Sequence, residues 1–128
     1  MSGLVAGLGC RRGVAVEALC SVVAQALHRA GQQRRDLVLL AVPSFKQGAD
    51  FAQVAERFAV PLVLVEDAAL QAVQGACLTR SAAAQRAVGL GSIAEAAALA
   101  AAGPGARLLG PRIALDGATC AVARQAVP

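Results

Sequence analysis

The sequence contains no tryptophan or tyrosine, only three phenylalanines and one histidine in 128 residues. The core must therefore be aliphatic, with helices and strands closely spaced. The near absence of aromatic side chains also leaves no platform on which nucleic-acid bases could stack, so no nucleic-acid partner is expected. Because His28 has no second imidazole beside it in the chain, a zinc or iron centre or a Ser-His centre of the usual kind is excluded. We expect neither a metal site nor a bound cofactor.

The four cysteines, Cys10, Cys20, Cys77 and Cys120, form no C-x-x-C pair, and no secretory signal precedes them. A disulfide scaffold or a thiolate metal site is not expected, and the predicted location is the cytoplasm. The longest unbroken apolar run, Ala96 to Gly103, is far shorter than the roughly 20 residues that span a bilayer, so no membrane segment is predicted. The net charge of +4 favours anionic partners.

The hydrophobic pattern predicts alternating strands and helices in a single domain that covers residues 1–128. Continuous apolar runs predict a buried strand at Leu4–Gly9, a strand buried on both faces at Leu37–Val42 and a third strand at Val60–Val65. Helical spacing follows at Val14–Ala30, Asp50–Phe58, Ala68–Val73 and Ser92–Ala102, with a further helical piece around Ser81–Ala87. The predicted apolar stripe of the first helix consists of Val16, Leu19, Cys20, Val23 and Leu27. Asp116-Gly117 predicts a C-terminal β-hairpin. The predicted fold is a three-layer α/β/α arrangement with a mixed, mostly parallel sheet and the hairpin at an edge or beside the first strand.

The first strand-to-helix loop, Gly7–Gly13, is a candidate anion site. Ligands of parallel α/β sheets lie beyond the carboxyl ends of the strands, where a helix amino end, glycine backbone amides, Arg11 and Arg12 would attract a carboxylate or phosphate. The loop is neither the dinucleotide fingerprint, because its third glycine comes one residue late, nor a P-loop, because the G-K-[ST] ending is absent. A glycine-rich turn with surface arginines remains the alternative. Cys10 has no general base nearby in sequence and is expected to be inert.

The second loop, which follows the second strand, holds Ser44 and Lys46. The lysine could bind an anion or polarise a carbonyl, with Ser44 donating a hydrogen bond, or it could simply face solvent. Asp50 follows near the amino end of the next helix, where the helix dipole favours an acid. Further along, Ser92 and Glu95 have the spacing of a capping box, which favours a structural role for both.

Four segments in this order resemble the family of cobalamin-biosynthesis proteins formed by CobE and the C-terminal domain of CbiG: Gly7–Gly13, Ser44–Lys46, Gly91–Ala98 and Ala118–Arg124. The resemblance covers essentially the whole chain. It implies a role in making the corrin ring, and, because no additional amino-terminal domain is present, in the branch associated with the aerobic pathway. Precorrin intermediates carry many carboxylates, which suit a basic, glycine-lined edge.

Three functions are compatible with this resemblance. The preferred one is an accessory or carrier protein that binds a precorrin, with substrate-binding residues Gly9, Cys10, Arg11, Arg12, Gly13, Ser44, Lys46, Ser92 and Thr119. The second is a hydrolase-type enzyme that opens a lactone or acyl group on the precorrin ring, as the long anaerobic-pathway relatives do, with catalytic residues Lys46, Asp50 and Glu95. Those relatives usually carry an acid three positions after the loop lysine, where this chain has Ala49. The third is a partner subunit of a ring-contraction or methyltransferase enzyme of the pathway.

Overall fold

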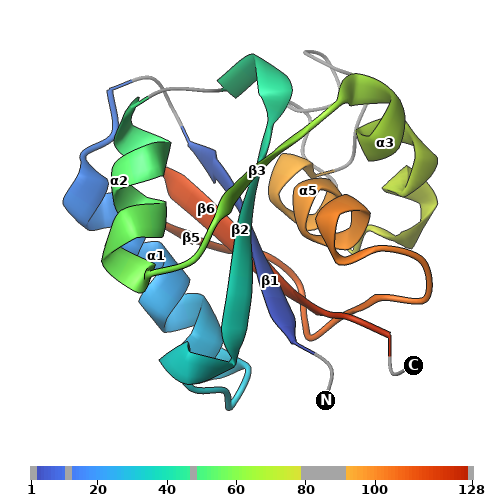
Figure 1. Ribbon diagram of the computed structural model, residues 1–128, viewed down its shortest axis with the longest axis horizontal. Helices are drawn as coiled ribbons and strands as arrows, with labels where there is room; N and C mark the ends of the chain where they lie inside the picture. The colour runs from blue at the N-terminus through green and yellow to red at the C-terminus, as the bar shows by residue number, and fades with distance from the viewer. Residues whose placement is uncertain (1–2, 11–12, 47–48, 79–91, 127–128) are drawn as a thin grey trace.

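The computed structural model describes residues 3–10, 13–46, 49–78 and 92–126, and it consists of one twisted sheet with helices on both faces (Figure 1). The strands are β1 (Leu4–Cys10), β2 (Leu37–Pro43), β3 (Leu62–Val65), β4 (Arg107–Leu108), β5 (Ile113–Leu115) and β6 (Ala118–Arg124). The α-helices are α1 (Val16–Arg29), α2 (Ala49–Phe58), α3 (Asp67–Ala72) and α5 (Ile93–Ala102). Short 3-10 helices among the described residues are η1 (Arg34–Asp36), η2 (Ser44–Lys46) and η3 (Gln74–Ala76).

The strand order in the sheet is β3-β2-β1-β6-β4, and β5 also pairs with β6. Strands β1, β2 and β3 are parallel neighbours, whereas β6 is antiparallel to β1, to β4 and to β5. Among the described strands β6 therefore runs against all the others, and the predicted mixed, mostly parallel sheet is confirmed. The hairpin of β5 and β6 lies beside the first strand, one of the two positions predicted for it. The two-residue strand β4 was not predicted, because two residues are too few to show a period.

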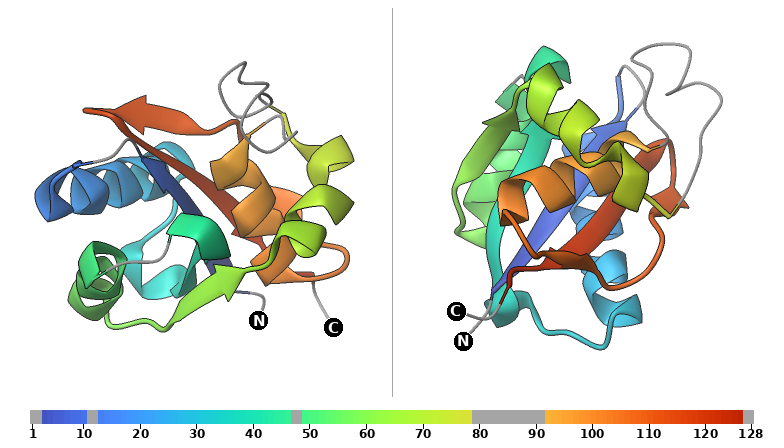
Figure 2. Two further views of the ribbon diagram at one scale, coloured as in Figure 1. Left: turned by 90° about the horizontal axis from the view of Figure 1, so that it is seen from above. Right: turned by 90° about the vertical axis from the view of Figure 1, so that its right-hand side faces the viewer.

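Helices cover the two faces of the sheet in pairs, as Figure 2 shows: α1 and α2 on one side, α3 and α5 on the other. Successive side chains of β1 point to opposite faces, so Leu4 and Leu8 pack in the cluster with α1 and α2, while Val5 packs in the cluster with α3 and α5. Both sets are fully buried. This explains why the strand reads as a continuous apolar run instead of an alternating one.

The two glycines within β1 face α5 and allow this helix to approach the sheet closely. A Cβ atom added to Gly7 would lie 2.1 Å from the carbonyl oxygen of Ala94 and 2.6 Å from the amide nitrogen of Ala98. The helix itself, IAEAAALAAA, presents mostly methyl groups to the strand. Small residues on both elements thus bring backbone against backbone, which a sequence almost without aromatic residues requires for dense packing.

The helix and turn predictions are largely confirmed, with shifts of one or two residues at the ends. In α1 the buried residues are Leu19, Val22, Val23, Ala26 and Leu27, so the buried stripe is centred slightly away from the predicted one, and Cys20 is only half-buried. The hairpin turn has positive φ at both Asp116 (53°) and Gly117 (85°), as a type I′ turn requires. The predicted helical piece Ser81–Ala87 lies outside the described residues. None of the described helices has the length and apolar character needed to cross a membrane.

Candidate functional site

The two predicted loops emerge at the same level of the sheet. Strands β1 and β2 are parallel, and their register places Gly7 opposite Ala41. Three residues further along each strand, the chain reaches Cys10 at the end of β1 and Ser44 at the start of η2. The carboxyl ends of β1 and β2 therefore open side by side at the upper edge of the sheet in Figure 1, where η2 lies.

Four helices direct their amino ends toward this carboxyl edge. Helices α1, α2 and α3 each follow a parallel strand and so begin at the edge where that strand ends. Helix α5 reaches it by packing: its first residue, Ile93, lies within 4.0 Å of a Cβ built on Gly9, near the end of β1. Because the amino end of a helix carries a partial positive charge, this arrangement favours an anion at the edge.

Thr119 of β6 joins the first loop to the C-terminal hairpin. Its hydroxyl Oγ1 donates a hydrogen bond to the carbonyl oxygen of Gly9 over 3.3 Å, and the two residues are direct partners in the β1–β6 register. The same register pairs Cys10 with Ala118, the first residue of β6. A side chain at position 9 would collide with the threonine, since a Cβ there would lie 2.8 Å from Oγ1. The predicted residues Gly9, Cys10 and Thr119 are thus brought together by strand pairing.

The other predicted residues of the two loops are placed as follows. Gly13 is exposed and has a φ of 83°, a conformation that glycine adopts without strain. Ser44 is half-buried, and Asp50 is exposed in the first turn of α2. Arg11 and Arg12 lie outside the described residues. For Lys46 the structure places the backbone within η2 and does not describe the side chain.

Ser92 and Glu95 are the only polar residues in the described buried core, and both have structural partners. Ser92 is the N-cap of α5, and its Oγ accepts a hydrogen bond from the Glu95 amide at 3.3 Å, which confirms the serine half of the predicted capping box. The Glu95 carboxylate reaches further than a capping box requires. Oε1 accepts from the Leu78 amide at 2.6 Å and Oε2 from the Arg112 amide at 2.8 Å. One buried side chain thus ties the chain at 78 and at 112 to the amino-terminal half of α5.

No disulfide joins any of the four cysteines, all of which lie in the described part of the chain. Cys120 is fully buried in β6, and burial raises the pKa of its thiol well above the ordinary range because the thiolate would lose its solvation. Within residues 3–10, 13–46, 49–78 and 92–126, no three side chains of His, Cys, Asp or Glu are grouped so that they could hold a metal ion.

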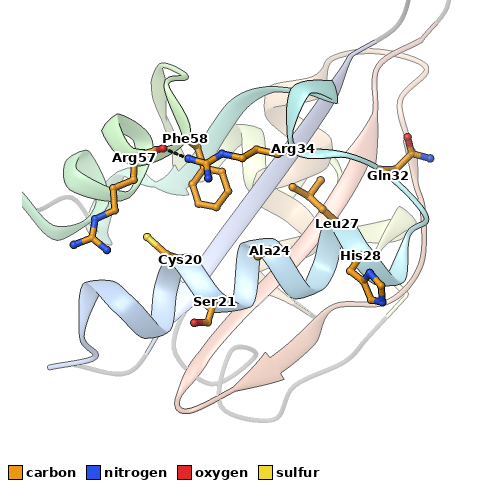
Figure 3. A pocket seen from close by; sticks show the side chains of 9 residues that line it. All are labelled: Cys20, Ser21, Ala24, Leu27, His28, Gln32, Arg34, Arg57 and Phe58. Atoms are coloured by element: carbon orange, nitrogen blue, oxygen red, sulfur yellow. Dashed lines mark hydrogen bonds between the residues drawn. The ribbon is translucent and has the colours of Figure 1, made fainter.

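A groove that the sequence analysis did not predict runs between α1 and the C-terminal end of α2 (Figure 3). It has a volume of about 600 Å³ and is lined by Cys20, Ser21, Ala24, Leu27, His28, Gln32, Arg34, Arg57 and Phe58. On α1 the lining residues recur at helical spacing, which was available as a signal. The contributions of η1 and α2, however, come from segments that only the fold brings against α1.

Comparison with known proteins gives consistent matches. A family model described as cobalamin synthesis G C-terminus matches residues 4–123. The crystal structure of CobE, described as a protein from the cobalamin (vitamin B12) biosynthetic pathway, is 35% identical with a TM-score of 0.90, over 99% of this chain and 93% of that one. The cobalamin biosynthesis protein chiG from Agrobacterium tumefaciens is 38% identical with a TM-score of 0.74, over 94% and 96%.

A third structure, of a cobalamin biosynthesis protein G homologue from Sulfolobus solfataricus, is 23% identical with a TM-score of 0.76. The match covers 98% of this chain and 37% of that larger chain, and at this identity it supports the fold alone. A search of curated proteins gave no match.

Proposed function

This chain belongs to the cobalamin synthesis G C-terminus family, and we propose that it serves cobalamin biosynthesis by binding a carboxylate-rich precorrin as an accessory or carrier protein. The observation that supports this most is the convergence of four helix amino ends on one edge of the sheet, beside the glycine-lined end of β1. Such an edge attracts anions through backbone amides alone, and a precorrin presents several carboxylates.

The proposed binding residues come from three elements of this edge. Backbone amides from Gly9 to Gly13 and the arginines Arg11 and Arg12 are the first set, in the loop after β1. Ser44 and Lys46 follow β2, the strand next to β1. On the other side of β1, the Thr119 hydroxyl fixes the carbonyl of Gly9 and thereby the course of the chain as it enters the loop. Charge-assisted bonds from the arginines and the lysine to ligand carboxylates would supply most of the affinity.

Hydrolysis of a lactone or acyl group on the precorrin ring is a second candidate function. The observation that favours it is the position of Asp50, exposed in the first turn of α2 and only four residues beyond Lys46. In this mechanism Lys46 polarises the carbonyl under attack and Asp50 accepts a proton from water. Glu95 is less suited to the role of base, because both of its oxygens accept hydrogen bonds from backbone amides in the interior.

The deciding experiment mixes the purified protein with a series of cobalt-free precorrins and follows retention on gel filtration, the absorption spectrum and the mass of the pigment. Retention without a change of mass supports the carrier. A change of mass that is lost in both Lys46→Ala and Asp50→Ala makes the protein a hydrolase. If the protein neither retains a precorrin nor changes its mass, the remaining hypothesis is that the protein is a partner subunit of a methyltransferase or ring-contraction enzyme.

Two arginine variants test the location of the site. Arg12→Ala should weaken precorrin retention by roughly ten- to a hundredfold, the effect of losing one hydrogen bond to a charged group. Arg29→Ala is the matched control, because it removes the same charge from the last turn of α1, at the opposite end of that helix. Equal retention by Arg12→Ala and the unmodified protein would place the site elsewhere.

A further inference from the structure

We propose that the groove between α1 and α2 is a second binding site, for a small organic acid that joins a carboxylate to a flat apolar body. The site is separate from the carboxyl edge of the sheet, and the argument for it does not depend on the function proposed above. It rests on the shape of the groove and on the chemistry of its two walls, which Figure 3 shows from close by.

One wall of the groove, its apolar floor, is a stripe of side chains on α1. Cys20, Ala24 and Leu27 lie three or four residues apart, on neighbouring turns of one helix face. Ala24 is exposed and ends at a methyl group, so the space above it is not filled by the protein. Together with Phe58 at the end of α2, this stripe gives the groove an apolar floor.

The facing wall carries a guanidinium that is held in place before any ligand arrives. The Cζ atom of Arg34 lies 4.4 Å from the centroid of the Phe58 ring, a cation–π contact, and the group donates a hydrogen bond to the carbonyl oxygen of Arg57. Its other N–H groups have no hydrogen-bonding partner within the described part of the chain. A guanidinium fixed in one plane binds a carboxylate with less loss of side-chain entropy than a free one.

The charges around the groove leave it open to an anion. Arg57 is paired only loosely with Glu17, at 3.7 Å between Nη2 and Oε1, and the two side chains are 51% and 75% exposed. A pair of this kind contributes little to stability, so a ligand carboxylate can compete for the arginine. The nearby acid of η1, Asp36, is already engaged, because it accepts a hydrogen bond from the Gln33 amide at 2.9 Å. An anion entering the groove therefore meets two arginines and one displaceable carboxylate.

The size of the groove suits a compact ligand. A volume of about 600 Å³ lies within the range of small-molecule sites, which are roughly 300–1,000 Å³ and combine apolar walls with a few polar groups. A ligand with one carboxylate would place it against the guanidinium of Arg34 and its apolar body over Ala24 and Leu27. A ligand that is only charged would leave the apolar floor uncovered.

The test uses 2-naphthoate as the probe and Cys20 as the reporter. Alkylation of Cys20 in the intact protein, followed by mass spectrometry of its peptide, should slow at least fivefold at saturating 2-naphthoate. The neutral analogue 2-naphthalenemethanol and a hexaglutamate peptide, at the same concentration, should slow the alkylation of Cys20 less than twofold. Absence of saturable protection by 2-naphthoate would overturn the proposal, and equal protection by hexaglutamate would overturn the assigned ligand class.

Two pairs of variants separate a site from a general effect on folding. Arg34→Ala should raise the Kd for 2-naphthoate at least tenfold, whereas Arg35→Ala, an exposed neighbour outside the groove, should change it less than twofold. Ala24→Leu fills the groove without removing a charge and keeps a good helix former in α1, so it should abolish binding in a folded protein. Its control is Gln25→Leu, which is exposed on α1 and does not line the groove. Binding that survives Ala24→Leu would refute the location.

Discussion

Replacing Gly7 with alanine tests the close packing of α5 on β1, on which the amino end of α5 depends for its position. The new methyl group would lie 2.1 Å from the Ala94 carbonyl oxygen, and even a very tight contact of 3.0 Å would require a displacement of about 0.9 Å. Both nearest atoms belong to the backbone of α5, so no side-chain rotation can relieve the overlap.

We expect Gly7→Ala to lower the free energy of unfolding by about 3 kcal/mol, the upper end of the cost of overpacking a core. The assay is urea unfolding followed by circular dichroism, with the midpoint and the slope compared between variants. Gly75→Ala is the control, because its Cβ would meet nothing within 4 Å and its φ is not positive. A loss below 0.5 kcal/mol for Gly7→Ala, equal to that of the control, would refute the reasoning.

Three further predictions concern stability. Glu95→Gln sets an amide N–H₂ against one of two backbone donors and should cost about 1–3 kcal/mol in the same assay, whereas the exposed Glu56→Gln should change stability by less than about 0.5 kcal/mol. Because burial raises the pKa of the Cys120 thiol, the unfolded chain loses this proton at lower pH than the folded protein. Stability should therefore fall as pH rises above roughly 8.5, and Cys120→Ala should lack this part of the fall in urea titrations at stepped pH. Gly117→Ala places a methyl group at a φ of 85° and should lower the free energy of unfolding by about 1 kcal/mol, which thermal unfolding would show as a lower midpoint. An unchanged midpoint would contradict the type I′ turn.

Most of the fold could be predicted because each element leaves a local signal. The continuous apolar run of β1 marks a strand buried on both faces, and Asp116-Gly117 marks the tight turn of the C-terminal hairpin. For β2 the same prediction is confirmed only from Leu40 onward, because Val38 is exposed near the start of the strand. Strand β4 could not be predicted, since its two residues form a strand through their pairing with Arg124 and Ala123 of β6. The predicted buried stripe of α1 is centred slightly away from the observed one. Whether a position on this helix is half-buried or fully buried depends on the side chains that other elements pack against it, and the sequence of the helix alone does not reveal them.

Part of the candidate site could also be predicted from the order of the elements and from local sequence patterns. Loops that follow parallel strands lie at the same edge of the sheet. The order of the elements was therefore enough to place Cys10 and Ser44 at that edge. The capping role of Ser92 follows from its spacing to Glu95. The hydrogen bonds that the Glu95 carboxylate accepts from the Leu78 and Arg112 amides could not be predicted, because each of these residues is 17 positions away along the chain.

The fold class, the positions of the long elements and the family could be predicted from the sequence, because they depend on hydrophobic periodicity, turn residues and a characteristic order of segments. Which residues far apart in the chain contact one another is known only from the folded structure. It placed Thr119 on Gly9, the Glu95 carboxylate on two distant amides, and Arg34 over Phe58 beside the stripe of α1. Each of these contacts depends on how the helices pack against the sheet, and packing is a property of surfaces that are assembled only when the chain has folded.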